Sequence, residues 1–276
     1  MDLTTTSKWR AQQVTDNVWF ERTVRVGLVA YGVVHLLIAW LALQLAFGHQ
    51  SSSASQQGAL HNLARQPFGT ELLWIVAIGL FALAIWQATQ VWWGHRSEDN
   101  PKQLFKRVGS AGRVVIYAAI GISAIETAVG SGSSSQNQKS QQTTAQLLAL
   151  PFGRLLVAGV GIVIILVAVV HAKRGLTESF TKDLTGGATS GSSGTVIVRL
   201  GQVGYIAKAV AFFVLGGLFI WAAWTYDAKK AGGLDQALAT LLGEGFGPWL
   251  LVVVALGIGC FGLYCFAWAR YADTST

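Results

Sequence analysis

The feature that most constrains this chain is a series of six long apolar stretches, each close to the ~20 residues that cross the hydrocarbon core of a bilayer. They cover residues 24–47, 72–93, 108–129, 152–172, 201–224 and 249–269. A membrane β-barrel would instead show alternating stretches of about ten residues. Lipid offers no partner to free backbone groups, so a continuous apolar stretch of this length must be helical. Only 12% of the residues are charged, about half the fraction usual in soluble domains. The sequence therefore predicts an all-α membrane protein with six transmembrane helices.

The six stretches form three copies of a two-helix unit. A glycine opens each odd-numbered stretch and a phenylalanine precedes each even-numbered one, with spacings of 41, 43 and 42 residues; the pairs are Gly27 and Phe68, Gly109 and Phe152, and Gly204 and Phe246. Because each unit has an even number of spans, all three units insert in the same orientation. We therefore expect three parallel repeats with pseudo-threefold symmetry about the membrane normal, and the alternative is an open row of the three hairpins. The predicted organisation is a leader at residues 1–23 and repeats at 24–94, 106–173 and 199–270.

A short amphipathic helix is expected before the second span of each repeat. Leucines recur at helical spacing there, at equivalent positions that include Leu63, Leu147 and Leu241, and such a helix lies on the membrane surface. The Pro-Phe-Gly steps that follow, centred on Phe68 and Phe152, predict a turn into the membrane, because proline disfavours helix before it and glycine permits the turn. The polar segments 51–57, 131–144 and 186–195 are rich in Ser, Gly and Gln, which predicts flexible hydrated loops.

The basic residues are distributed asymmetrically between the two sides of the predicted bundle. Thirteen Lys and Arg fall in the leader, the second and fourth connections and the C-terminal tail, against five in the other connections. This positive-inside pattern predicts a multi-pass membrane protein with both termini in the cytoplasm. The first span would serve as an uncleaved insertion signal. The net charge of +7 then reflects topology and contact with anionic lipids on the cytoplasmic side, and no nucleic-acid partner is predicted.

Three polar residues share one position in the repeat, four residues after the anchoring glycine. They are Tyr31, Arg113 and Lys208. One hypothesis is that they form a polar ring about a turn inside the cytoplasmic interface, which binds a lipid phosphate or an anionic solute. The alternative is that the long basic side chains extend to the interface and do nothing more.

Three further polar side chains are candidates because ionisable or polar groups within spans are often functional. His35 lies near mid-membrane, and a haem held between His35 and His171 is disfavoured because His171 ends its span. Glu126 is the acidic residue inside an apolar stretch, near the outer end, where a paired or interface-facing glutamate is the simpler interpretation. Gln87 belongs to a polar patch of the second span and can hydrogen-bond a neighbouring helix.

A resemblance accompanies these patterns. The runs that begin at Gly27 (Gly27-x-x-x-Tyr31-Gly32-Val33-Val34-His35) and at Gly109, together with the Pro-Phe-Gly steps, resemble a bacterial membrane family, the domain of unknown function numbered 1206. The resemblance spans essentially Arg22 to Arg270 and implies three two-helix repeats and a location in a bacterial inner membrane. It implies no activity.

No enzyme signature is found in the sequence: it has no phosphate loop, no dinucleotide-binding glycines, no paired metal-ligand helix and no nucleophile elbow. We therefore predict no catalytic residues, no metal and no cofactor. The leading hypothesis is a non-enzymatic membrane subunit that binds lipids or other membrane proteins. The alternative is a transporter or channel for a small solute or ion, which would use the pseudo-threefold axis.

Overall fold

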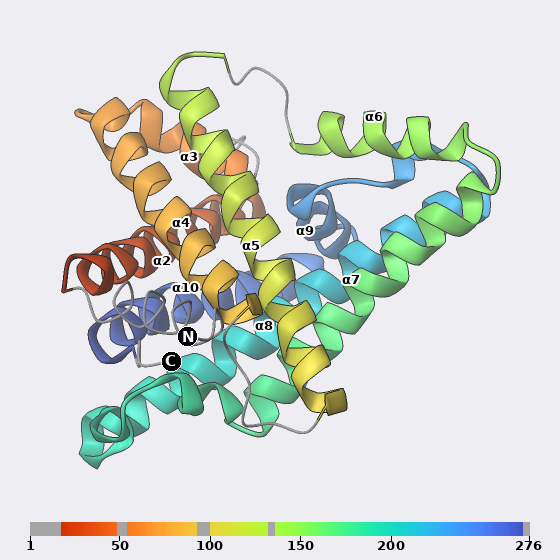
Figure 1. Ribbon diagram of the computed structural model, residues 1–276. Helices are drawn as coiled ribbons and strands as arrows, with labels where there is room; N and C mark the ends of the chain where they lie inside the picture. Colours follow the sequence, from red (N-terminus) through yellow and green to blue (C-terminus); the bar gives the residue numbers. More distant parts are fainter. Residues whose placement is uncertain (1–17, 49–53, 93–99, 132–135, 273–276) are drawn as a thin grey trace, which may run out of the picture.

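The computed structural model describes residues 18–48, 54–92, 100–131 and 136–272, and these are almost entirely helical (Figure 1). Within them, six helices are long and apolar enough to cross a membrane, which confirms the predicted fold class. They are α2 (Val18–Ala46), α4 (Gly69–Trp92), α5 (Asn100–Ala128), α7 (Gly153–Leu176), α8 (Gly191–Thr225) and α10 (Gly247–Tyr271). The predicted leader lies largely outside the described residues.

Each repeat contains a short helix between its two spans, as predicted. These helices are α3 (Gln56–Ala64), α6 (Gln136–Leu148) and α9 (Leu234–Leu242), and three 3₁₀ turns complete the fold, η1 (Ser179–Asp183), η2 (Gly186–Thr189) and η3 (Ala228–Lys230). Since each span crosses once, α3, α6 and α9 belong to one side of the bundle, called here the loop side. The start of α2 and the end of α10 belong to the other side, called here the terminal side.

The second span of every repeat packs along the first span of the next repeat. The three pairs are α4 with α5, α7 with α8, and α10 with α2. Two of these crossings are very close: a Cβ atom at Gly32 would lie 2.8 Å from the carbonyl oxygen of Gly262, and one at Gly161 would lie 2.8 Å from that of Gly216. Small residues permit such backbone contact between membrane helices. Because α10 returns to α2, these contacts join the first and last repeats; a rotational relation among the repeats stays a prediction.

Packing within the repeats is not equivalent. In repeats 1 and 3 the two spans touch, α2 with α4 and α8 with α10, whereas α5 and α7 are not packed along each other. A Cβ atom at Gly27 would collide with the carbonyl oxygen of Gly79 on α4, but one at the equivalent Gly109 would meet no atom within 4 Å. Val163 of α7 occupies the position of Gly79 and Gly257, eleven residues after the phenylalanine. A β-branched side chain at that position prevents the close approach that glycine allows.

The separation leaves α5 and α7 more exposed than the other spans. The buried share of the most apolar window is 22% for α5 and 17% for α7, against values between 44% and 61% for the other four. In Figure 1 the two helices diverge toward α6. The ring of spans is therefore open within the middle repeat, and this opening is called here the α5/α7 gap.

The turn into the second span differs in detail from the prediction. Phe68 and Phe152, both with φ of 61°, adopt the left-handed conformation, so the phenylalanine makes the turn. Gly153 is required for another reason: a Cβ atom there would collide with the carbonyl oxygen of Leu147 at the end of α6. The glycine thus allows the surface helix to end directly above the membrane helix.

The prediction of flexible loops was wrong for two of the three polar segments. Residues 136–144 belong to α6, and most of 186–195 belongs to η2 and the start of α8. Polar contacts hold α6: the Ser140 hydroxyl donates to the carbonyl of Gly232 at 3.1 Å, and the amide of Gly233 donates to Asn137 at 2.6 Å. A polar composition does not prevent a helix whose side chains find such partners.

Candidate functional site

Lys208 lies at the centre of the helix ring, midway along α8. Its side chain is buried, with 7% of the residue exposed. The Nζ atom donates to the hydroxyl oxygen of Tyr31 at 3.1 Å and lies 3.4 Å from Nε2 of His35. Lys208 therefore does not extend to the membrane interface, and the alternative offered from sequence does not describe it.

His35 is oriented to accept a hydrogen bond from Lys208. Its Nδ1 atom lies 2.8 Å from the carbonyl oxygen of Tyr31, one turn earlier on α2. A carbonyl oxygen can only accept, so Nδ1 carries the proton and Nε2 of the neutral ring is an acceptor. Both ring nitrogens are thus engaged, and His35 offers no nitrogen to a haem iron in this arrangement.

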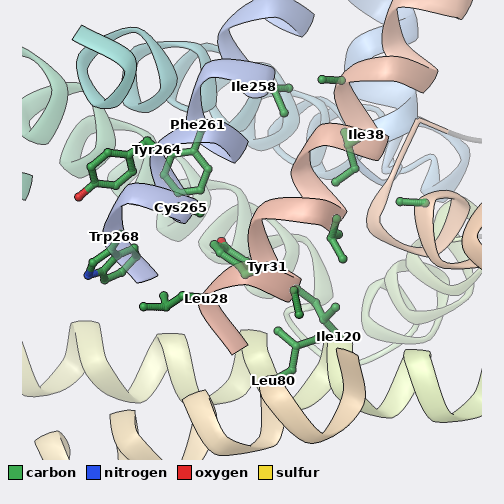
Figure 2. Close-up of a cluster of buried hydrophobic side chains, with 14 of the residues drawn as sticks. Leu28, Tyr31, Ile38, Leu80, Ile120, Ile258, Phe261, Tyr264, Cys265 and Trp268 are labelled. Atoms are coloured by element: carbon green, nitrogen blue, oxygen red, sulfur yellow. The ribbon is translucent and has the colours of Figure 1, made fainter. Parts of the chain in front are cut away.

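Aromatic rings surround the ammonium group of Lys208. The Nζ atom lies 3.9 Å from the ring centroid of Phe261 on α10 and 5.3 Å from that of Tyr31, both within the range of cation–π contact. Figure 2 shows Tyr31 on α2 among Phe261, Tyr264 and Cys265 of α10. The ring of Tyr117 on α5 meets the ring of Tyr31 edge to face, with centroids 5.3 Å apart. Side chains from α2, α5, α8 and α10 thus enclose the group, called here the Lys208 cluster.

Arg113 stands at the edge of this cluster. It precedes Tyr117 by one helical turn, so the two side chains share a face of α5. Arg113 is partly exposed and forms no hydrogen bond or ion pair with another described residue. Of the three equivalent residues singled out from sequence, the structure thus brings Tyr31 and Lys208 into direct contact and leaves Arg113 beside them with its guanidinium available.

The sequence alone did not place His171 of α7 beside the Lys208 cluster. The ring of His171 packs on Tyr205 and Phe212 of α8, with centroids 5.7 Å and 5.4 Å away. A signal for this residue was present in the repeat, because Gln87, His171 and Cys265 each lie nineteen residues after the phenylalanine of their unit.

The charges around the Lys208 cluster are predominantly positive. Arg174 donates to Asp183 at 3.1 Å and to the Tyr205 hydroxyl at 3.3 Å, which balances one cation with one carboxylate. Among the described residues, no carboxylate pairs with Lys208 or Arg113. The arrangement offers two cations and a tyrosine hydroxyl, which suits an anion, and it offers no acid–base pair for catalysis.

The remaining candidates lie apart from this cluster or play another part. Glu126 forms an ion pair with Lys139 on the loop side, in which Lys139 Nζ donates to Glu126 Oε2 at 2.9 Å and both side chains are partly exposed, as the simpler interpretation predicted. Gln87 is 1% exposed on α4, and its Oε1 atom has no hydrogen-bond partner. Over the described parts of the chain, no group of three His, Cys, Asp or Glu residues could hold a metal ion.

Comparison with known proteins agrees with the repeats and assigns no activity. The chain is 30% identical over 247 residues to the "Uncharacterized protein YxxB" of Bacillus subtilis (strain 168), an alignment that covers 89% of each chain. No solved structure matches it. The family described as Domain of Unknown Function (DUF1206) matches three times, over residues 26–94, 108–178 and 203–272. These matches fall on the three repeats and cover most of the sequence, so the chain belongs to the DUF1206 family of membrane proteins of unknown function.

Proposed function

We propose that this protein is a non-enzymatic membrane protein that binds an anionic headgroup at the Lys208 cluster, with anionic lipids of its own membrane as the ligand class. The observation that carries the proposal is the buried ammonium group of Lys208, whose contacts with the described residues are all with uncharged groups. Taking an isolated charge out of water costs several kcal/mol unless an opposite charge compensates it. A phosphate next to Lys208 supplies that charge.

The neighbouring groups are suited to phosphate oxygens. A guanidinium can bind two oxygens at once, and Arg113 has its donors available. The Tyr31 hydroxyl accepts from Lys208, so its own proton is free to be donated to a third oxygen. The nearby carboxylate of Asp183 is neutralised by Arg174, which lessens its repulsion of an anion.

The same arrangement gives less support to a solute path along the axis. Tyr31, His35 and Phe261 pack ring against ring at the centre, with centroid separations between 4.3 and 6.0 Å. A path would require these rings to move apart, whereas binding of a headgroup requires only space beside Lys208 and Arg113.

Native mass spectrometry of the full chain, with phosphatidylglycerol as the probe and phosphatidylcholine as the zwitterionic reference, tests the proposal. Lys208→Met keeps the length of the side chain and removes its charge. A hydrogen bond to a charged group contributes about 1.5–3 kcal/mol, so we expect roughly tenfold to hundredfold weaker retention of phosphatidylglycerol. Arg113→Gln in the same chain should weaken retention further.

Two other variants serve as a matched control and as a milder test. Lys173→Gln removes a cation that is exposed on the terminal side and should leave retention within about twofold, because an exposed charge contributes little. Tyr31→Phe removes only a hydroxyl and should weaken retention about fivefold. Retention that falls equally in Lys173→Gln and Lys208→Met would show ordinary surface attraction and would refute a defined site.

A further inference from the structure

We infer that the anionic lipid reaches the Lys208 cluster sideways from the bilayer, through the α5/α7 gap of the middle repeat. This inference rests on the proposed function and adds the route. It starts from a difference in packing among the three repeats. Spans of repeats 1 and 3 meet their partners, and the spans of repeat 2 do not.

On α5, the helix face that lines the gap packs against no other described residue at its two glycines. Gly109 and Gly112 are exposed, and a Cβ atom at either would meet no atom within 4 Å. Ile116 follows on the same helical face, with 43% of its surface exposed. The corresponding faces of α2 and α8 are covered, because Gly27 lies against α4 and Gly204 lies against the backbone of Phe261.

The opposite wall on α7 is apolar. Val163 and Leu166 are 59% and 58% exposed. In the other repeats the position of Val163 is a glycine buried in the contact between the two spans, Gly79 or Gly257. The acyl chains of a lipid can therefore lie against both walls without meeting a polar side chain.

The polar end of the gap is cationic. Arg113 lies on α5 and His171 on α7, where the ring of His171 packs on Tyr205 of α8. Tyr117, which is buried against Tyr31, is the α5 side chain that separates the gap from Lys208. Apolar walls that lead to uncompensated cations fit a molecule with hydrocarbon chains and a negative headgroup. A second copy of this chain fits less well, because it would bring no carboxylate from the same faces of α5 and α7.

The test fills the gap and leaves the cluster unchanged. Gly112→Phe places a phenyl ring on the exposed face of α5, at the position that directly precedes Arg113 in the sequence. Gly217→Phe is the matched control, because Gly217 is also an exposed glycine of a first span with no atom within 4 Å of an added Cβ. We expect Gly112→Phe to weaken phosphatidylglycerol retention about tenfold or more, while Gly217→Phe stays within about twofold of the unmodified chain.

Each outcome separates the route from the site. Unchanged retention in Gly112→Phe, with retention lost in Lys208→Met, would refute the lateral route and keep the headgroup site. Inorganic phosphate that displaces the lipid equally well in the unmodified chain and in Gly112→Phe would point to a soluble anion that arrives from water, and would also overturn the route. A dimer that Gly112→Phe converts to a monomer would identify the face as a protein interface and refute the inference.

Discussion

The same substitution at two equivalent glycines should have opposite effects on stability. Alanine at Gly27 places a methyl group against the carbonyl oxygen of Gly79 and within 2.7 Å of Leu83 Cγ. Because the backbone carbonyl of Gly79 cannot move aside on its own, α2 and α4 must move apart. Overpacking of this kind costs about 1–3 kcal/mol. Alanine at Gly109 meets no atom within 4 Å and gains up to about 1 kcal/mol of helix propensity.

The propensity gain is common to both variants and cancels, so the difference between them is the overpacking cost of about 1–3 kcal/mol. For a chain of this size, 1 kcal/mol shifts the melting temperature by roughly 2–4 °C. We expect Gly27→Ala to unfold about 2–12 °C below Gly109→Ala when both are heated in the same detergent, with Gly109→Ala at or above the unmodified chain. Gly204→Ala should behave like Gly27→Ala, because a Cβ atom at Gly204 would lie 2.6 Å from the backbone Cα atom of Phe261. An equal loss of stability in Gly109→Ala would mean that α5 and α7 are packed, and the α5/α7 gap would not exist.

Three further results are expected. With the two native cysteines replaced by serine, a membrane-impermeant maleimide should label Lys229→Cys in intact cells and should not label Ser190→Cys; the opposite pattern would invert the predicted cytoplasmic placement of the termini. Glu126→Gln should change the free energy of unfolding by less than about 1 kcal/mol in a denaturant titration, because its pair with Lys139 is partly exposed, and a larger loss would indicate a structural role. Gly153→Ala should destabilise the chain by about 1–3 kcal/mol, because the end of α6 lies where the methyl group would go; a neutral result would argue against the described turn.

The span number and the repeat were predictable because both depend on local pattern. Continuous apolarity forces helix in lipid, and the interval between glycine and phenylalanine counts residues along the chain. The α5/α7 gap was harder to predict, since it depends on which faces meet. One residue carried a hint: Val163 stands where repeats 1 and 3 have Gly79 and Gly257. Its meaning emerges only once those two glycines are seen inside contacts between helices.

The candidate site was predicted in part. Positional equivalence in the repeat singled out Tyr31 and Lys208, and their side chains do meet. An equivalent position in the repeat does not indicate how deeply a side chain is buried. The sequence therefore placed Lys208 only about a turn inside the cytoplasmic interface. His171 was set aside because it ends the apolar stretch of its span. In the structure α7 continues to Leu176, and the ring of His171 packs inward against α8. Hydrophobicity predicts that a span exists better than it predicts the residue at which the span ends.

The contacts of α5 explain why the route would lie in the middle repeat. Among the described residues, α5 packs along one other span, α4, and touches α2 through the ring of Tyr117. Its loop-side end is tied to α6 by the partly exposed pair of Glu126 and Lys139, and α6 is tied in turn to the third repeat by polar contacts such as that of Ser140. Partly exposed polar contacts are individually weak, and elements with few buried contacts open at lower free energy than the rest of a fold. The packed set of α2, α8 and α10 holds Tyr31, His35 and Lys208 in place. An outward movement of α5 would therefore withdraw Tyr117 and expose a preformed group of donors to the bilayer.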